Sequence, residues 1–310
     1  MKILGNHIQI DLIKKLIEKK QFPNSLILSG QKGVGKSLIA RNIAYCLVDC
    51  IKLDELNYIN KLTSHDILFV CKGNLEEKKQ SKQLMSRDDI SHISSFFKTK
   101  NESHSKRVCI IDAIDDLSLD AINSLLKIIE EPNINNHFIL ISHDNKKLLP
   151  TIKSRSFQIK FNNFKKSDFL SILDEIDDLK TVNHSYLYEL TRGSLNISRS
   201  YINNDFRDID DHLQKIYENK NSIKSNTAYH YINFLNNKGG DKALIISFFD
   251  YLILKKILYI KSSINNLHYT KIDRFISMAN ELKKLKERYI TFNLSFEHIL
   301  IHYFNLLKQQ

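Results

Sequence analysis

The segment Gly30 to Ser37, with the sequence GQKGVGKS, has the residue types and spacing of a loop that binds nucleotide phosphates. In the pattern G-x-x-x-x-G-K-[ST], backbone N–H groups surround the phosphates, the lysine reaches the β- and γ-phosphate oxygens, and the hydroxyl binds Mg²⁺. Lys36 and Ser37 would take these two roles. Gly30, Gly33 and Gly35 are three of only eight glycines in the chain. The segment therefore predicts a site for ATP with Mg²⁺, and a plain strand-to-helix turn is the simpler alternative.

A phosphate-binding loop needs an acidic side chain from a second strand. The apolar run Val108–Ile111 ends in Asp112, which could hold the water shell of Mg²⁺. An ordinary strand in a sheet core would show the same pattern. The next residue, Ala113, has no proton acceptor, and Asp115 and Asp116 come too late to lie on the strand. We therefore expect nucleotide binding with little or no hydrolysis.

Other catalytic or metal chemistries have weaker support. Cys46, Cys50, His65 and Cys71 share a region, but only the gap from Cys46 to Cys50, of three residues, is short, and the other gaps are long for a typical zinc module. Buried apolar cysteines are the simpler explanation, and no zinc is expected. The adjacent acids Glu130 and Glu131 stand at the end of a predicted helix and point apart.

The elements that position these residues alternate between strands and helices in the first half of the chain. Strands are predicted at 25–28, 67–70, 108–111, 138–141 and 157–161, separated by helices that include 88–97 and 119–129. This order is typical of an α/β domain with a mostly parallel sheet. Asn6 is expected to cap a first helix in which Ile8, Leu12, Leu16 and Ile17 share a face.

No convincing strand follows Phe161. Three short helices are expected over 165–179, 183–191 and 195–202, and longer ones from 207 to 308, with breaks at Asn221, Asn236-Asn237 and Gly239-Gly240. We therefore divide the chain into an α/β domain over 1–163, a small helical domain over 164–205 and an all-helical domain over 206–310.

Composition excludes several classes of protein. With 8 glycines and 3 prolines in 310 residues, the chain lacks the turn formers of an all-β sandwich or barrel. We expect no membrane span and no signal peptide, and four scattered cysteines favour a cytoplasmic location. A net charge of +11 suggests a polyanionic partner, although a lysine-rich composition would give the same charge. Lys283, Lys284, Lys286 and Arg288 form a basic face that is more typical of solvated surface than of a DNA site.

Several segments together resemble the clamp-loader subunits of bacterial DNA polymerase III, which are AAA+ proteins. They are His65-Asp66, Arg87–Phe97, AINSLLKIIEEP over Ala121–Pro132 and LPTIKSRS over Leu149–Ser156. The resemblance is stronger to the delta-prime type of subunit than to the ATP-hydrolysing gamma/tau type. It covers about Ser25 to Phe161, and beyond that only Arg192-Gly193-Ser194 resembles the sensor-two turn. For the last third of the chain, the resemblance rests only on the order of the elements and their helical character.

The resemblance implies roles for further residues. Arg155 would act in trans as an arginine finger on ATP held by a neighbouring subunit, whereas outside the family it reads as an ordinary surface arginine. Ser142 stands at the sensor-one position, and the end of a core strand is an equally good interpretation. The hydrolysing subunits have a glutamate where this chain has Ala113 and an arginine where it has Asn196.

The implied fold is an AAA+ P-loop domain, a small helical lid and a helical collar. The implied function is that of a stator in a hetero-pentameric ring with gamma/tau and delta subunits, which loads the sliding β clamp on primer-template DNA. Two alternatives stay open. The chain could be an ATP-hydrolysing gamma/tau-like subunit, against which Ala113 and Asn196 argue. It could also be a non-replicative AAA+ regulator, which would not need the EEP and SR segments together.

Overall fold

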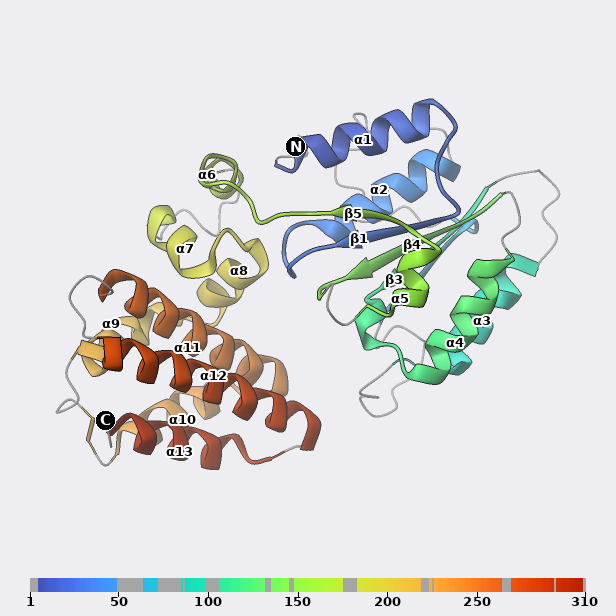
Figure 1. Cartoon of the computed structure of the whole chain (residues 1–310). Coiled ribbons are helices and arrows are strands. Elements are labelled where there is room, and N and C mark those ends of the chain that lie inside the picture. Colours follow the sequence, from blue (N-terminus) through green and yellow to red (C-terminus); the bar gives the residue numbers. More distant parts are fainter. Residues whose placement is uncertain are drawn as a thin grey trace. The chain divides into compact units, whose positions relative to one another are not determined.

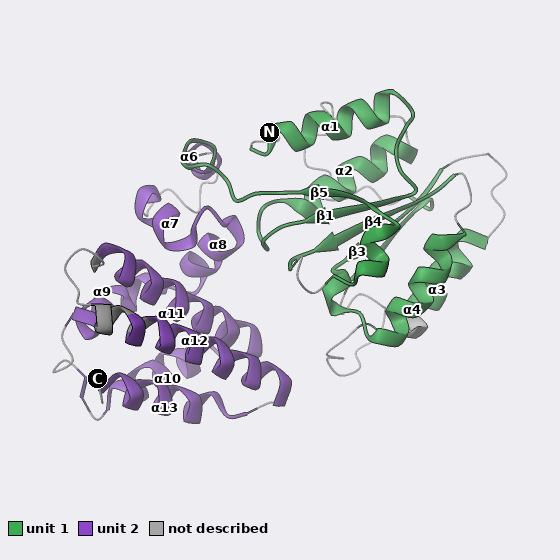
Figure 2. Cartoon of the chain, viewed as in Figure 1, with its two compact units in different colours: residues 1–168 green, residues 169–310 purple. Residues whose placement is uncertain are grey.

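The computed structural model shows two compact units, residues 1–168 and 169–310 (Figure 2). Each is described below by itself. The described residues are 5–48, 64–71, 85, 87–98, 106–131, 135–144, 148–174, 183–218, 223–224, 226–263, 269–292 and 294–308.

The first unit is built on a five-stranded sheet in the order β2-β3-β4-β1-β5, with every neighbouring pair parallel (Figure 1). The strands are β1 (Ser25–Ser29), β2 (Ile67–Cys71), β3 (Arg107–Asp112), β4 (Asn136–Ser142) and β5 (Phe157–Lys160). All five carboxyl ends lie at one edge of the sheet because the strands are parallel. Loops at that edge are the ones that can share a ligand.

Helices cover both faces of this sheet, with α1 and α2 on one face and α3 and α4 on the other (Figure 1). Their bounds are α1 His7–Glu18, α2 Lys36–Val48, α3 Arg87–Lys98, α4 Leu119–Glu130 and α5 Pro150–Ser154, with a 3₁₀ turn η1 at Ile114–Asp116. The central strands β1, β3 and β4 are almost wholly buried, as expected when both faces are covered. Alternate residues such as Ile27, Ile111 and Leu140 pack with Leu125 and Ile129 of α4.

The start of α1 differs from the sequence prediction. Asn6 occupies the N-cap position but makes no side-chain cap; its side chain instead exchanges two hydrogen bonds with the backbone of Asn162, at 3.0 and 2.9 Å. The predicted apolar face does not form the contact with the core. Ile10 and Ile13 are buried, whereas Ile8 is 81% exposed. The tertiary bonds to Asn162 replace the local cap and set which face of α1 turns inward.

The second unit is entirely helical in its described residues. Its helices after α6 (Lys166–Asp174), which crosses the division between the units, are α7 His184–Thr191, α8 Leu195–Asn203, α9 Arg207–Glu218, α10 Thr227–Asn237, α11 Lys242–Ser263, α12 Tyr269–Phe292 and α13 Phe296–Lys308. Helix α11 contacts α7, α8, α9 and α12, so it is the centre of the unit. Gly239 and Gly240 take left-handed conformations between α10 and α11, as the predicted break there requires.

The predicted fold class is confirmed: a parallel α/β unit carrying a P-loop is followed by helices. The further division at residue 205 stays a prediction, since residues 169–310 form one compact unit. Among the described helices, none combines the length and apolar character that a membrane-spanning helix needs. The cytoplasmic location also stays a prediction.

Candidate nucleotide-binding site

The loop after β1 is held close to the neighbouring strands β4 and β5. The Gly30 N–H donates to the Ser142 carbonyl at 3.2 Å, and a Cβ at Gly30 would lie 2.3 Å from the Phe161 carbonyl oxygen. Gly30 also has φ +145°, in the region that disfavours a side chain. Only glycine fits there. The first glycine of the motif therefore lets the chain pass between the ends of two strands and turn into α2.

Lys36 begins α2 and is only 3% exposed. Its amine donates to the carbonyls of Gly30 at 2.6 Å and Gln31 at 2.7 Å. Burial lowers the pKa of Lys36 to about 8, partly opposed by the charges of Asp112 and Asp115. The amine thus lies inside the curl of the loop, where a phosphate oxygen would compete with the two carbonyls for its protons.

Ser142 ends β4, the strand next to β1, and Asp112 ends β3, which lies beyond β4. In the register of the sheet, Ser142 pairs with Ser29 of β1, and Asp112 pairs with Ile141 of β4. The sheet therefore brings the predicted site residues to one edge. They are Gly30, Gly33, Gly35, Lys36 and Ser37 from the loop, Asp112 from β3 and Ser142 from β4.

Asp115, which the sequence places off the strand, has a structural role at the site that the sequence did not reveal. Its carboxylate accepts a hydrogen bond from the Ser142 hydroxyl at 2.9 Å and others from the backbone N–H groups of His143 and Asp144. It fastens η1 to the loop after β4. This carboxylate is engaged by three donors, so it is not free to act as a base in place of Ala113. A lone aspartate in a connecting turn gives no sequence signal for such a role.

His143 is a second residue that sequence reasoning missed. Its Nε2 lies 3.7 Å from Asp112 Oδ1, too far for a hydrogen bond. Burial and the nearby Lys36 charge lower the pKa of His143, opposed by Asp112 and Asp115. A neutral imidazole therefore lies beside the Asp112 carboxylate, which is predicted to hold the water shell of Mg²⁺.

The polar groups around the loop fit Mg²⁺ and a nucleoside triphosphate. Gly33 and Gly35 have φ +92° and +86°, and a Cβ at Gly35 would meet no atom within 4 Å, so space remains beside the loop. The first-turn N–H groups of α2 have no partner within their helix and suit phosphate oxygens. Ser37 and Asp112 offer the oxygen ligands that Mg²⁺ prefers. Residues that bind are present, but Ala113 is buried and offers no acceptor for hydrolysis.

Arg155 lies elsewhere on the first unit, directly after α5. Its Nη2 lies 2.7 Å from Glu130 Oε1, and its Nη1 donates to the Thr151 carbonyl at 3.1 Å and to the Ser154 hydroxyl at 3.3 Å. Both side chains of the ion pair are well exposed, Arg155 at 39% and Glu130 at 45%. Arg155 is therefore a surface group of this unit.

The sequence pattern of the family described as "DNA polymerase III, delta subunit" matches residues 5–165, just over half of the chain. The chain belongs to this family. The matched range holds the phosphate-binding loop, Asp112, Ser142 and Arg155, so every predicted site residue lies within the family's own region.

Curated relatives agree with this assignment. The chain is 31% identical to the DNA polymerase III subunit delta' of Bacillus subtilis over 166 residues, which is 50% of this chain and 48% of that protein. It is 27% identical to the DNA polymerase III subunit gamma of Buchnera aphidicola from Schizaphis graminum over 237 residues, 73% of this chain and 61% of that protein. These matches thus span only about half to three fifths of the relatives' own length.

A solved structure supports the fold of the family member along almost its whole length. A DNA polymerase III gamma subunit-related protein from Thermotoga maritima superposes with a TM-score of 0.55 at 17% identity. The superposition covers 97% of this chain and 99% of that one. At this identity the likeness concerns the AAA+ fold alone, including the helical second half.

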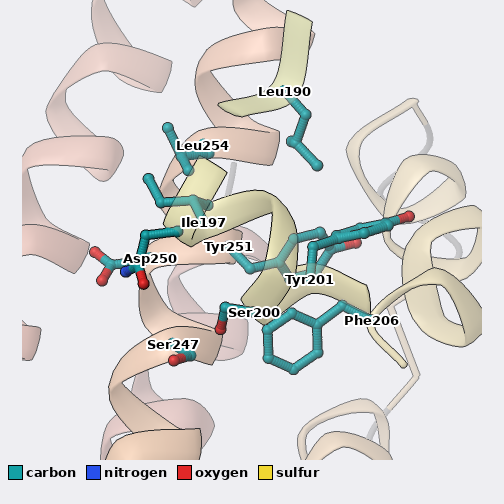
Figure 3. Close-up of a pocket in the computed structure, with 10 residues that line it drawn as sticks. Leu190, Ile197, Ser200, Tyr201, Phe206, Ser247, Asp250, Tyr251 and Leu254 are labelled. Carbon is teal, nitrogen blue, oxygen red and sulfur yellow. The ribbon is translucent and has the colours of Figure 1, made fainter. Parts of the chain in front are cut away.

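Asn196, where the resemblance expects the sensor-two arginine, lies in α8 of the second unit. It lines a hollow of about 370 Å³ that is open to solvent, together with Ser200, Ser247 and Asp250. Tyr201, Phe206 and Tyr251 pack against one another along its wall (Figure 3). Asp250 is the one charged residue in the lining. The described residues of the lining offer no cation to a phosphate, so this hollow is not assigned to the nucleotide.

The cysteine–histidine group and the basic face of α12 are the two remaining candidates from the sequence. Cys46 is buried and Cys71 half-buried, Cys50 lies outside the described residues, and no cluster of three metal-ligating side chains occurs among the residues that the structure describes. On the basic face of α12, Lys286 pairs with Asp250 at 2.5 Å. Lys286 therefore has an acidic partner within the chain, and the prediction that this face is ordinary solvated surface requires no contact with DNA.

Proposed function

We propose that this chain is a clamp-loader subunit of DNA polymerase III that acts as a stator. In this proposal it supplies Arg155 in trans to ATP bound by a neighbouring ATPase subunit. The observation that carries it is the exposed guanidinium of Arg155 on a P-loop unit that has no proton acceptor at position 113. An arginine finger is worth on the order of 10³–10⁵ in phosphoryl transfer, because it neutralises charge that develops on the phosphate.

The chain's own site would hold ATP with Mg²⁺ without turning it over. The backbone of Gly30 to Gly35, the Lys36 amine, the Ser37 hydroxyl and the Asp112 carboxylate are the residues that would hold it. The nucleotide would supply negative charge that orders the loop and draws Lys36 from its carbonyl partners. Ser142 donates its hydroxyl proton to Asp115, so while that bond persists it has no proton to donate to an oxygen of the γ-phosphate. Nucleotide here is thus a structural ligand.

The partners in this proposal are gamma/tau and delta subunits in a hetero-pentameric ring, joined by the helical second half. The ring would open the sliding β clamp and place it on primer-template DNA. A diffuse charge of +11 suits a protein held near DNA within an assembly. The names of the delta' and gamma relatives support membership of this complex.

Reconstitution of the loader tests the proposal. The complex is assembled with its gamma/tau and delta partners, and clamp- and DNA-stimulated ATPase is measured for Arg155→Ala and Lys36→Ala. We expect the Arg155 change to lower turnover far more than the Lys36 change. The purified chain alone should show almost no ATPase activity.

The opposite result would favour the second candidate, an ATP-hydrolysing gamma/tau-like subunit. Its support is the complete phosphate-binding loop and the longer match to a gamma subunit. If Lys36→Ala abolishes turnover while Arg155→Ala leaves it intact, the stator function is wrong. Robust ATPase activity of the isolated chain would lead to the same conclusion.

A further inference from the structure

Glu130 and Arg155 lie at the ends of two different helices that pack into the same apolar core. Glu130 is the last residue of α4, and Arg155 directly follows α5. Ile129 of α4 and Ile152 of α5 are both buried in one apolar cluster. Core packing therefore holds the two helix ends in place independently of the ion pair. A contact between fixed backbones orders its side chains at a smaller loss of entropy than one between mobile loops.

The contacts of Arg155 come from two directions. Glu130 Oε1 engages Nη2 at 2.7 Å, while the Thr151 carbonyl and the Ser154 hydroxyl both engage Nη1. Thr151 and Ser154 belong to α5, the short helix directly before the arginine, so they keep the group close to α5 without fixing its plane. Glu130 is the acceptor from a different element. It fixes the second terminal nitrogen and so the orientation of the planar group.

The position of Glu130 is unfavourable for its own helix. The carboxyl end of a helix carries partial negative charge, so a carboxylate in the last turn is disfavoured there and a lysine or arginine is preferred. The exposed pair with Arg155 contributes little to stability, since surface ion pairs are weak. Neither helix formation nor fold stability accounts for a carboxylate at this position. Its one specific partner in the described structure is Arg155.

We infer that Glu130 is a positioning residue for Arg155, which holds the guanidinium in a fixed orientation for a phosphate of the neighbouring subunit. The inference rests on the proposed arginine-finger function. A guanidinium carries more N–H groups than Glu130, Thr151 and Ser154 occupy, so donors remain for phosphate oxygens. Without Glu130 the long side chain would spread over several rotamers. It would then have to be ordered again in each transition state.

The adjacent Glu131 provides a matched control. It caps α4 with φ −117° and ψ 63°, outside the helix, and is exposed like Glu130. Glu130→Gln and Glu131→Gln remove the same charge from neighbouring positions and keep the side-chain size. A difference between the two variants therefore reports the contact with Arg155 and not the net charge of this surface.

The first measurement uses the isolated chain and no partner. Rotation about the guanidinium C–N bonds of Arg155 is measured by NMR with labelled arginine, its signal being assigned by its loss in Arg155→Ala. We expect slow rotation in the native chain and in Glu131→Gln, and fast rotation in Glu130→Gln. Equal rotation in all three would overturn the inference, whatever the function of the chain.

The second measurement is the stimulated ATPase of the reconstituted loader. We expect Glu130→Gln to lower kcat about two- to fivefold at unchanged KM for ATP, which is the range that a surface ion pair converts to. Glu131→Gln should match the native loader. If Arg155→Ala lowers the rate but the two glutamine variants are equal, the positioning role is wrong and the finger stands. If Arg155→Ala has no effect, the arginine-finger function fails and the positioning role fails with it.

Discussion

The Asp115 carboxylate accepts a hydrogen bond from the Ser142 hydroxyl at 2.9 Å and so joins the turn after β3 to the end of β4. The same carboxylate binds the backbone N–H groups of His143 and Asp144. It thereby joins the carboxyl ends of β3, where Asp112 lies, and of β4, the strand next to the one that leads into the phosphate-binding loop. Three donors on one carboxylate make Asp115 the organising group of this edge, even though it supplies no catalytic chemistry.

Replacement of Asp115 by alanine should therefore destabilise the first unit. The change leaves two backbone N–H groups and a hydroxyl without their acceptor, and a lost hydrogen-bond partner of this kind costs about 1–3 kcal/mol. Urea unfolding monitored for the first unit would show a lower midpoint. Asp116→Ala is the control, because the described contact of Asp116 with Met85 uses its backbone carbonyl and not its side chain. Equal midpoints for both variants would mean that the carboxylate does not fasten this edge.

The two glycines at the ends of the loop should respond differently to alanine. At Gly30 a Cβ would lie 2.3 Å from a backbone oxygen, which cannot move aside without shifting β5. At Gly35 a Cβ would meet nothing, so only the positive φ is unfavourable, at about 1–2 kcal/mol. We expect Gly30→Ala to unfold or strongly destabilise the first unit, and Gly35→Ala to lower its unfolding free energy by about that smaller amount. Thermal melts compare the two directly. A Gly30→Ala protein as stable as Gly35→Ala would contradict the close approach to Phe161.

The sequence predicted features that depend on neighbouring residues better than features that depend on contacts between distant segments of the chain. The loop from Gly30 to Ser37 and the strand before Asp112 are local patterns, and parallel topology then places their ends at one edge. The contacts of Asp115 and Glu130 were not predicted, because their partners come from distant segments and no period or motif links a single acidic residue to them. The exposed Ile8 was misassigned for a similar reason. A helix pattern alone cannot show that Asn6 binds Asn162 and turns Ile10 and Ile13 inward.

Nucleotide binding should raise the melting temperature of the chain if the loop holds ATP with Mg²⁺. A ligand that binds only the folded state at 100 times its Kd adds about 2.7 kcal/mol of stability. We expect a clear rise for the native chain and for Lys32→Ala, an exposed residue of the same loop. Lys36→Ala should lose the rise, because the buried amine is gone. The same rise in Lys36→Ala would show that nucleotide binds elsewhere.

Replacement of two adjacent lysines in α11 of the second unit by methionine should have opposite effects on its stability. Lys255 is 3% exposed and pairs with Asp210 at 2.8 Å, which also accepts hydrogen bonds from Tyr186 and Tyr251. Lys255→Met would leave this carboxylate buried without its cation, a change that costs about 3–5 kcal/mol. Lys256 is fully buried, with its amine 4.5 Å from the centre of the Tyr217 ring. Lys256→Met places an apolar group of similar length there and should stabilise the unit near pH 7.

The Lys256→Met variant should also differ from the native chain in how its stability depends on pH. Burial lowers the pKa of Lys256 from 10.5 to about 7, so between these values the unfolded chain binds more protons than the folded one. Stability of the native chain should therefore rise with pH across this window. Lys256→Met lacks this titration, so its advantage over the native chain should be largest at pH 6 and shrink steadily towards pH 9. Urea unfolding at pH 6, 7, 8 and 9 measures this difference, and these values stay below the titration of tyrosines in the unfolded chain. An advantage that is constant with pH, or a Lys256→Met protein less stable than the native one at pH 6, would show that the buried amine keeps its charge at little cost.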